Sequence, residues 1–247
     1  MSSGRRIHLL TEGDDDRVVV QQLQLAGLVD PVFEILERDK SREGGFDLML
    51  AAAADGPLAA GKRVLVLRHL DDLSPAGVFA WLEEGLKKRR WAVQHRLGPA
   101  SPRTACLTVH RDDVQARIAV VAVGLPGDPS LAERSLTRFA MDDFLLLLAK
   151  ERAVYDAVSE MAGLSYDHAM EKLAKTVVLL RENTAPVHDA KRLLQLHRGL
   201  TGFRASAATF AKRLIQKANS VLGEQGMRQK FSPLVDGVEA ALRLLSA

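Results

Sequence analysis

Residues 7–16 read IHLLTEGDDD, a short apolar run followed by a turn and four acidic side chains. The apolar run Ile7–Leu10 stops at Thr11–Gly13, which is typical of a buried strand that ends in a tight turn. The carboxylates after the turn favour the start of a helix, because they cap free backbone N–H groups and complement the helix dipole. Apolar residues at helical spacing continue from there to Gly27. The segment therefore predicts a strand, a turn and a helix in direct succession.

A second apolar run, Val64–Leu67, contains only valine and leucine. Such a run without polar alternation is typical of a strand that is buried on both faces of a parallel sheet. A further strand is expected at 32–36, and helices are expected at 46–54 and at 74–90, the last beginning with a serine cap and a proline. This alternation of strands and helices predicts an α/β fold built on a parallel sheet.

The rest of the chain changes character after one more pair of strands. Residues 104–110 and 114–123 predict a hairpin that continues or flanks the sheet. From Ser130 onward the apolar spacing predicts helices only. We therefore expect an α/β domain over residues 1–124 and an all-helical C-terminal extension over residues 130–247.

Composition excludes several classes of protein. The 247 residues are 47% hydrophobic and 26% charged, which is ordinary globular usage and excludes a disordered tail, a coiled-coil rod or a collagen-like fibre. No apolar run reaches the roughly 18 residues of a membrane span, so a cytoplasmic protein that does not enter membranes is expected. The single cysteine, Cys106, excludes an intrachain disulfide and a thiolate zinc cluster. Nucleotide-binding glycine loops are also missing from the sequence.

Charge is distributed unevenly along the chain. Residues 1–60 carry six lysines and arginines against eleven aspartates and glutamates, whereas residues 181–230 carry ten against three. This distribution suits a metal site beside a face that binds a polyanion. It equally suits two ordinary solvated surfaces, because helices routinely display charge outward.

Basic side chains on one predicted helix, residues 203–222, are candidates for phosphate contacts. The candidates are Arg204, Lys212, Arg213 and Lys217. Lysine and arginine on the outward side of such a helix give nucleic acid affinity without reading bases. The alternative is that these side chains serve solubility alone.

Acidic residues follow both apolar strands at the point where each strand ends. Glu12 follows the first strand, and Asp71 and Asp72 follow the second. The carboxyl ends of parallel strands open on one edge of a sheet, so these side chains can converge although they are far apart in the sequence. Converging carboxylates repel one another unless a cation lies among them, and hard oxygen ligands select Mg²⁺ or Mn²⁺. Such a site can orient water and neutralise a phosphodiester in its transition state.

These motifs resemble the Toprim superfamily, the catalytic domain of type IA and type II topoisomerases, bacterial primases and OLD-family nucleases. The resemblance covers residues 6–123. It rests on Glu12, Gly13 and Asp16, which match a Glu-Gly-x-x-Asp motif, and on His69-Leu70-Asp71, which falls where the family has Asp-x-Asp. The resemblance implies that the glutamate is a general acid or base and that the second motif binds Mg²⁺.

Position 69 departs from the family pattern, because histidine stands where the family has its first aspartate. A neutral imidazole removes a negative charge and prefers softer metals. His69 therefore either shifts the site towards Mn²⁺ or marks a site that no longer catalyses. A second likeness, in Leu125–Gly127 followed by Met141–Phe144, is to the proline turn and acidic helix of small stand-alone Toprim proteins related to OLD nucleases.

The function predicted from these features is metal-dependent hydrolysis of phosphodiester bonds in nucleic acid, with DNA as the favoured partner and Mg²⁺ or Mn²⁺ as the cofactor. Glu12 would be the general acid or base and a metal ligand, Asp71 and Asp72 the other ligands, Asp16 a supporting carboxylate, and His69 an altered ligand or orienting group. The resemblance implies DNA maintenance or phage defence as the setting.

The alternative hypothesis is a catalytically inactive Toprim-like module that binds nucleic acid or serves as an assembly subunit. A protein partner or a second copy of the chain would fit either hypothesis. An unrelated α/β hydrolase is disfavoured, because the sequence has no Gly-x-Ser-x-Gly elbow.

Overall fold

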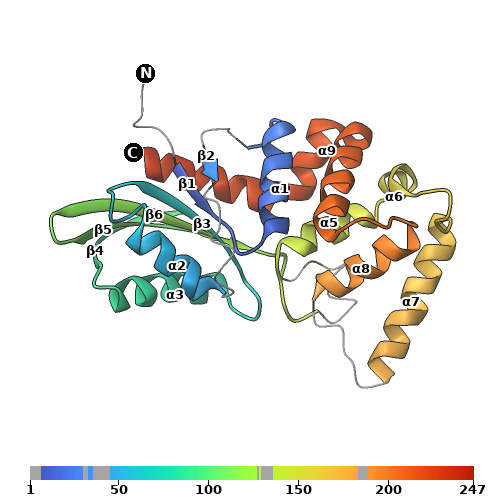
Figure 1. Cartoon of the computed structure of the whole chain (residues 1–247), viewed down its shortest axis with the longest axis horizontal. Coiled ribbons are helices and arrows are strands. Elements are labelled where there is room, and N and C mark those ends of the chain that lie inside the picture. Colours follow the sequence, from blue (N-terminus) through green and yellow to red (C-terminus); the bar gives the residue numbers. More distant parts are fainter. Residues whose placement is uncertain (1–6, 30–32, 36–44, 127, 129–135, 183–188) are drawn as a thin grey trace. The chain divides into compact units, whose positions relative to one another are not determined.

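The structure is a computed structural model that describes residues 7–29, 33–35, 45–126, 128, 136–182 and 189–247 (Figure 1). The chain divides into two compact units, which are described separately. The first unit contains the described residues of Met1–Arg17, Val29–Val123 and Pro233–Ala247, and the second contains those of Val18–Leu28 and Gly124–Ser232.

A mixed six-stranded sheet forms the centre of the first unit, with strand order β2-β1-β3-β6-β5-β4. The strands are β1 (Ile7–Leu10), β2 (Phe33–Ile35), β3 (Arg63–His69), β4 (Ala92–Ser101), β5 (Thr104–Arg111) and β6 (Val114–Val123). β1 pairs in parallel with β2 and β3, and β3 pairs in parallel with β6. The fold is therefore α/β, as the sequence predicts.

The sheet is not parallel throughout, which corrects the sequence prediction. β5 pairs antiparallel with β6, and β4 pairs antiparallel with β5. The reason is the tight connection between β5 and β6, in which Asp112 takes a positive φ of 54°. A turn this short can join only antiparallel neighbours, so the predicted hairpin extends the parallel half of the sheet with antiparallel strands.

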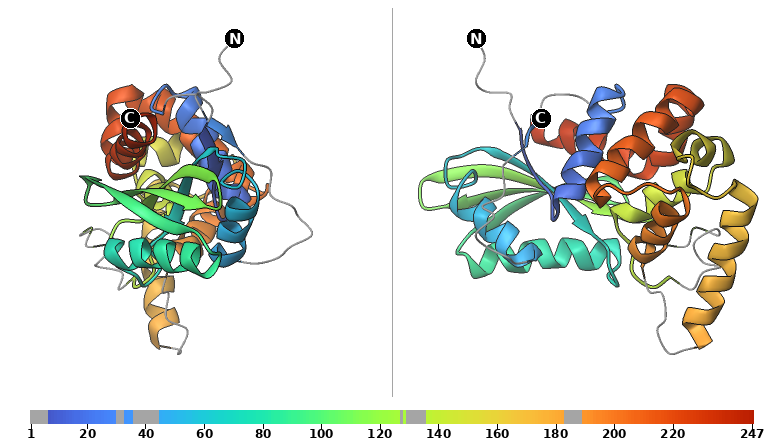
Figure 2. Two further views of the ribbon diagram at one scale, coloured as in Figure 1. Left: turned by 90° about the vertical axis from the view of Figure 1, so that its left-hand side faces the viewer. Right: turned by 45° about the vertical axis from the view of Figure 1, so that its right-hand side comes forward.

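Helices cover both faces of this sheet (Figures 1 and 2). On one face lie α2 (Phe46–Asp55) and α3 (Pro75–Lys88), and α3 contacts β4 and β6. Ser74 caps α3 as predicted, because its hydroxyl accepts a hydrogen bond from the Gly77 N–H at 3.2 Å. The opposite face is covered by the last part of α9, residues 233–246.

The helical segment on that second face packs unusually close to the strands at Gly237. The buried Thr104 hydroxyl donates to the Gly237 carbonyl at 3.0 Å. A Cβ atom at position 237 would lie only 2.8 Å from a methyl carbon of Val121. Glycine is therefore required there by the close approach of the helix to the sheet.

The second unit is helical in its described part, apart from one isolated β-bridge between Arg138 and Asp189. Its helices are most of α1 (Asp14–Leu25), α5 (Met141–Ala149), α6 (Arg152–Val158), α7 (Tyr166–Glu182), α8 (Ala190–Leu200) and the first part of α9 (Ala207–Ser246). Stacked rings of Phe144 and Phe231, with centroids 5.5 Å apart, join α5 to α9 in its core. The predicted helix start at Ser130 lies outside the described residues.

The sequence pattern also predicts a last helix at 232–246, and in α9 the predicted helix end at 222 is confirmed but the predicted start at 232 is wrong. The helix is broken at Gly223, which has φ 65° and ψ 178°, and it then continues through Pro233. Met227 and Phe231 are fully buried one helical turn apart. Their burial keeps residues before Pro233 helical, although proline removes a backbone hydrogen bond there.

Two expectations about the chain as a whole can be compared with this structure. None of the helices within the described ranges is both long enough and apolar enough to cross a membrane.

Cys106 is a free, fully buried thiol in β5, and burial raises its pKa to about 11. The thiol therefore packs as a small apolar group.

Candidate functional site

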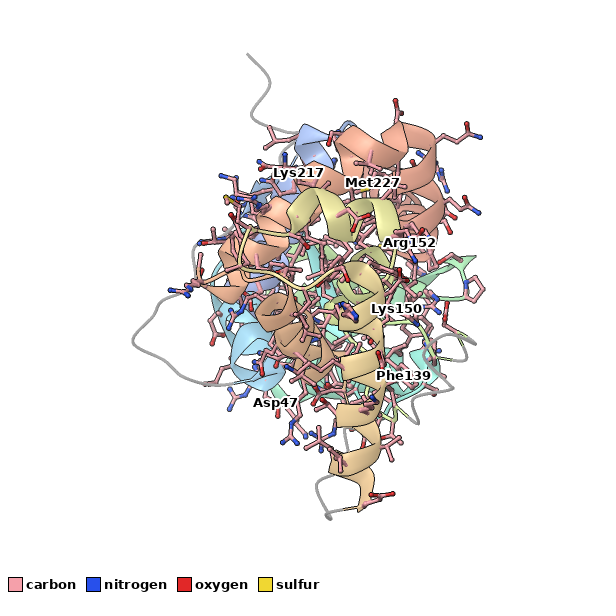
Figure 3. All side chains as sticks on the ribbon, turned by 90° about the vertical axis from the view of Figure 1, so that its right-hand side faces the viewer. Asp47, Phe139, Lys150, Arg152, Lys217 and Met227 are labelled. Carbon is pink, nitrogen blue, oxygen red and sulfur yellow. The ribbon has the colours of Figure 1, made fainter. Side chains whose placement is uncertain are left out.

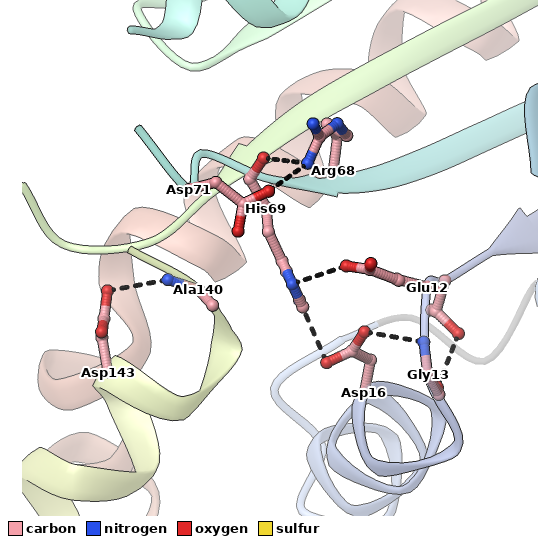
Figure 4. Close-up of polar contacts among 9 residues, drawn as sticks. Glu12, Gly13, Asp16, Arg68, His69, Asp71, Ala140 and Asp143 are labelled. Carbon is pink, nitrogen blue, oxygen red and sulfur yellow. Dashed lines mark hydrogen bonds and ion pairs between the residues drawn. The ribbon is translucent and has the colours of Figure 1, made fainter. Parts of the chain in front are cut away.

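The parallel pairing of β1 with β3 brings the two acidic motifs to one edge of the sheet, which confirms the predicted neighbours. Leu10 lies opposite Val66 in this pairing. Glu12, two residues beyond Leu10, therefore comes beside the end of β3, where Arg68 and His69 lie (Figure 4).

His69 lies between two carboxylates and bonds to both. Its Nδ1 is 2.9 Å from Glu12 Oε2, and its Nε2 is 3.1 Å from Asp16 Oδ1. The ring is largely buried, with 12% of the side chain exposed. An imidazole can donate from both nitrogens only when it is protonated. The geometry is therefore that of an imidazolium ion held between two negative charges.

The pKa of His69 agrees with this protonation state. Burial of the ring acts to lower the pKa, but the hydrogen bonds and negative charges of Asp16 and Glu12 outweigh burial and raise the pKa from 6.5 to about 10. Neighbouring carboxylates stabilise the charged form of histidine in this way. The ring therefore carries a proton throughout the physiological pH range.

Asp16 is fixed in place by the first turn of α1. Its Oδ2 accepts a hydrogen bond from the Gly13 N–H at 3.1 Å, while its Oδ1 faces His69. A carboxylate in the first helical turn that bonds back to the preceding backbone closes half of a capping box and complements the helix dipole. The acidic run that predicts a helix start thus also supplies one side of the His69 site.

Arg68 holds Asp71, the remaining residue of the second motif. Arg68 Nη1 donates to Asp71 Oδ2 at 2.8 Å and to the His69 carbonyl at 2.8 Å. Its guanidinium carbon lies 3.5 Å from the ring centre of Phe46, a contact that fixes the group. Asp71 has a positive φ of 51°, which turns its carboxylate back along β3 towards this arginine (Figure 4).

The fit of a divalent metal can be judged from these contacts. Mg²⁺ requires about six oxygen ligands near 2.1 Å in octahedral geometry. The carboxylates of Glu12 and Asp16 instead face the imidazolium of His69, and that of Asp71 faces Arg68. Asp72 is exposed. Across the described part of the chain, no group of three histidine, cysteine, aspartate or glutamate side chains is arranged to hold a metal. The residues in this arrangement do not fit Mg²⁺ or Mn²⁺.

The acidic helix of the second likeness has a structural task within its own unit. Asp143 is fully buried in the first turn of α5, and its Oδ2 accepts a hydrogen bond from the backbone N–H of Leu125 at 2.9 Å. The same oxygen accepts a second hydrogen bond, from the Ala140 N–H at 3.0 Å (Figure 4). Gly127 of the same likeness lies outside the described residues. Asp143 therefore anchors the turn that enters α5.

The four basic candidates of the second unit differ in how freely they can meet a phosphate. Arg204, Lys212 and Lys217 are exposed, and Figure 3 shows Lys217 at the surface of α9. Arg213 is instead tied to Glu160 at 3.0 Å and lies over the ring of Phe203. Only the first three present side chains suited to a ligand in solution.

Sequence reasoning missed Arg68 and Phe46 as parts of the site. Arg68 directly precedes the motif at His69 and would face the same sheet edge, so its position in the sequence is a usable signal. Phe46 is far from Arg68 in the sequence and belongs to neither of the two acidic motifs. Only the fold brings its ring against the Arg68 guanidinium.

Comparisons of this chain with protein-family models, curated proteins and solved structures gave no match. The functional argument therefore rests on the geometry of the chain's own residues.

Proposed function

We propose that this chain is a Toprim-like module that binds nucleic acid and does not cleave it. The observation that carries the proposal is the position of His69, which hydrogen-bonds Glu12 and Asp16 at 2.9 and 3.1 Å. In this arrangement a side chain of the protein supplies the positive charge that two neighbouring carboxylates require.

The same contacts remove the groups that hydrolysis would need. An imidazolium whose two N–H groups are both donated has no lone pair to accept a proton or to bind a metal. Glu12, the expected general acid or base, is engaged by that cation, and Asp71 is engaged by Arg68. The acidic cluster is thus compensated internally and links the ends of β1 and β3 to the first turn of α1 within the first unit.

Nucleic acid is the favoured ligand because of the charge elsewhere on the chain. Residues 181–230 carry ten lysines and arginines against three acidic residues, and Arg204, Lys212 and Lys217 are exposed in that region. Exposed cations of this kind neutralise backbone phosphates and bind with little sequence preference. The resemblance of residues 6–123 to a superfamily of nucleic acid enzymes supports the same class of ligand.

A metal-dependent nuclease is the second candidate function. The observation that favours it is the presence of Glu12, Asp16 and Asp71 at the carboxyl ends of neighbouring strands, the place where α/β folds bind ligands. For this candidate to hold, His69 would have to leave the two carboxylates when a metal ion binds.

Cleavage and binding assays separate the two candidates. Supercoiled plasmid and labelled single-stranded DNA are incubated with the purified chain and with Glu12→Ala, in Mg²⁺, Mn²⁺ or EDTA. The proposal predicts DNA binding that persists in EDTA, and no cleavage above that of Glu12→Ala. Cleavage that requires a metal and disappears in Glu12→Ala would establish the nuclease instead. Failure of the chain to bind either DNA would reject both candidates.

A further inference from the structure

A basic pocket lies in the first unit, at the edge of the sheet opposite to the Glu12 and His69 site. It is formed where α3 ends, β4 begins and β5 turns into β6, whereas His69 lies at the far end of β3. The pocket has a volume of about 380 Å³ and is lined by Arg89, Arg90, Ala92, His110, Arg111 and Asp112. This volume is at the small end of the range of about 300–1,000 Å³ that is usual for ligand sites.

Positive charge in the pocket exceeds the negative charge that could balance it. Three arginines line the pocket against one aspartate, Asp112. Arg89 donates to the carbonyl oxygens of Gly85 and Asp47 at 2.9 and 2.8 Å, so both of these acceptors are neutral groups. Arg90 is exposed, and its side chain has no ion pair within the part of the chain that the structure describes.

Arg111 is held in place without being neutralised at close range. Its guanidinium lies 4.8 Å from the ring centre of Trp91, and its contact with Asp55 Oδ1 is long, at 3.5 Å. Asp55 is itself 70% exposed, so this pair is weak. A guanidinium that is stacked on an aromatic ring but lacks a close carboxylate is preorganised for an incoming anion.

His110 adds a further possible donor to the same wall. It lies opposite Ala92 in the pairing of β4 with β5, and its Nδ1 is buried without a hydrogen-bond partner among the described residues. A buried polar nitrogen without a partner is costly, and such a group points to a ligand or water that would satisfy it.

From these contacts we propose that the pocket binds a phosphate group, with Arg90 and Arg111 as the principal ligands and Arg89 and His110 as supporting donors. Phosphate is the class of ligand that planar guanidinium groups bind best, through paired charge-assisted hydrogen bonds. The phosphate could belong to a phosphomonoester or to the backbone of nucleic acid. The pocket itself is independent of the proposed function, and only its use by nucleic acid rests on that function.

Calorimetric titration with inorganic phosphate at constant ionic strength tests the pocket directly. The unmodified chain is compared with Arg90→Gln/Arg111→Gln and with Lys87→Gln/Lys88→Gln, a control that removes the same charge from exposed neighbours outside the pocket lining. We expect saturable binding by the unmodified chain and the control, and affinity lower by roughly tenfold or more in the pocket variant. Lack of saturable binding by the unmodified chain, or an equal loss in the control, would overturn the proposal.

A second arm identifies the source of the phosphate, with one oligonucleotide that is tested with and without a 5′-terminal phosphate. If the pocket takes a terminal phosphate, the phosphorylated form binds the unmodified chain more tightly and loses this advantage in the pocket variant. If it takes backbone phosphate, both forms weaken equally in that variant. If the pocket variant loses affinity for inorganic phosphate but binds both oligonucleotides as tightly as the unmodified chain, the pocket binds free phosphate compounds. In that case the proposed use of the pocket by nucleic acid is wrong, while the phosphate site itself stands.

Discussion

Replacement of His69 by glutamine is the perturbation whose effect follows most directly from the structure. His69→Gln keeps a polar side chain but removes the positive charge between Glu12 and Asp16. The carboxylate of Asp16 would then be a buried charge without its cation, because only 7% of its side chain is exposed. Removal of one partner from a buried ion pair costs about 3–5 kcal/mol. We expect a loss of unfolding free energy of that size near neutral pH.

The pH dependence of the unfolding free energy gives a second estimate of how much the protonated His69 contributes to stability. Below pH 6.5 histidine is protonated in both the folded and the unfolded chain, so the full contribution of the pair is present. Between 6.5 and the folded pKa of about 10, only the folded chain keeps the proton. The unfolding free energy therefore falls by about 1.4 kcal/mol for each pH unit, and by at most about 5 kcal/mol in total. The advantage of the unmodified chain should thus shrink as the pH rises and should be lost near pH 10.

Urea unfolding followed by tryptophan fluorescence reports on the unfolding of the first unit, which contains His69. Trp81 and Trp91 are the only tryptophans of the chain, and both lie in that unit. The unmodified chain, His69→Gln and the control His95→Gln are compared from pH 6 to pH 10. His95 is exposed on β4, so its replacement should have little effect. A difference between the unmodified chain and His69→Gln that stays below about 1 kcal/mol, or that does not change with pH, would refute the bridging role of His69.

Three further predictions concern the metal, the basic helix and the packing of the sheet. His69→Asp should bind Mg²⁺ more tightly than the unmodified chain in calorimetric titration, because it replaces a cation with a hard oxygen ligand; equal affinities would exclude position 69 from any role in metal binding. Lys212→Gln/Lys217→Gln should lower the slope of log affinity for duplex DNA against log salt by up to about 1.8, and an unchanged slope would assign both lysines to solubility. Gly237→Ala should lower the unfolding free energy by about 1–3 kcal/mol in urea titrations, because the added methyl group would lie 2.8 Å from a carbon of Val121; an unchanged midpoint would show that the helix can move away from the sheet.

Much of the architecture could be predicted from local pattern. Val64–Leu67 is apolar without alternation, which indicates a central strand, and the alternation of strands and helices around it indicates parallel pairing with Ile7–Leu10. The cap at Ser74 is likewise decided by neighbouring residues. By contrast, the continuation of α9 through Pro233 depends on the burial of Met227 and Phe231, which a local pattern does not reveal.

The site was harder to predict, because its chemistry depends on which charges meet. The sequence shows Glu12 and Asp16 in one motif and His69 in the other, so the meeting of the two motifs could be expected from the strands. The sequence does not show that the ring of His69 bonds both carboxylates, or that Arg68 takes Asp71 out of the cluster. These contacts depend on side-chain directions that the fold sets, and they form an ionic cluster at the place where the sequence predicts a metal site.

The most direct test of this account is the protonation state of His69, measured by ¹⁵N NMR of the histidine rings at pH 8 with and without millimolar Mg²⁺. The unmodified chain should show a signal from a ring with both nitrogens protonated that is absent from His69→Gln. Addition of Mg²⁺ should leave the ring unchanged, because Glu12 and Asp16 remain bonded to it. A neutral His69 ring at pH 8, or a protonated ring that loses its proton when Mg²⁺ is added, would contradict the claim that histidine supplies the cation of this site.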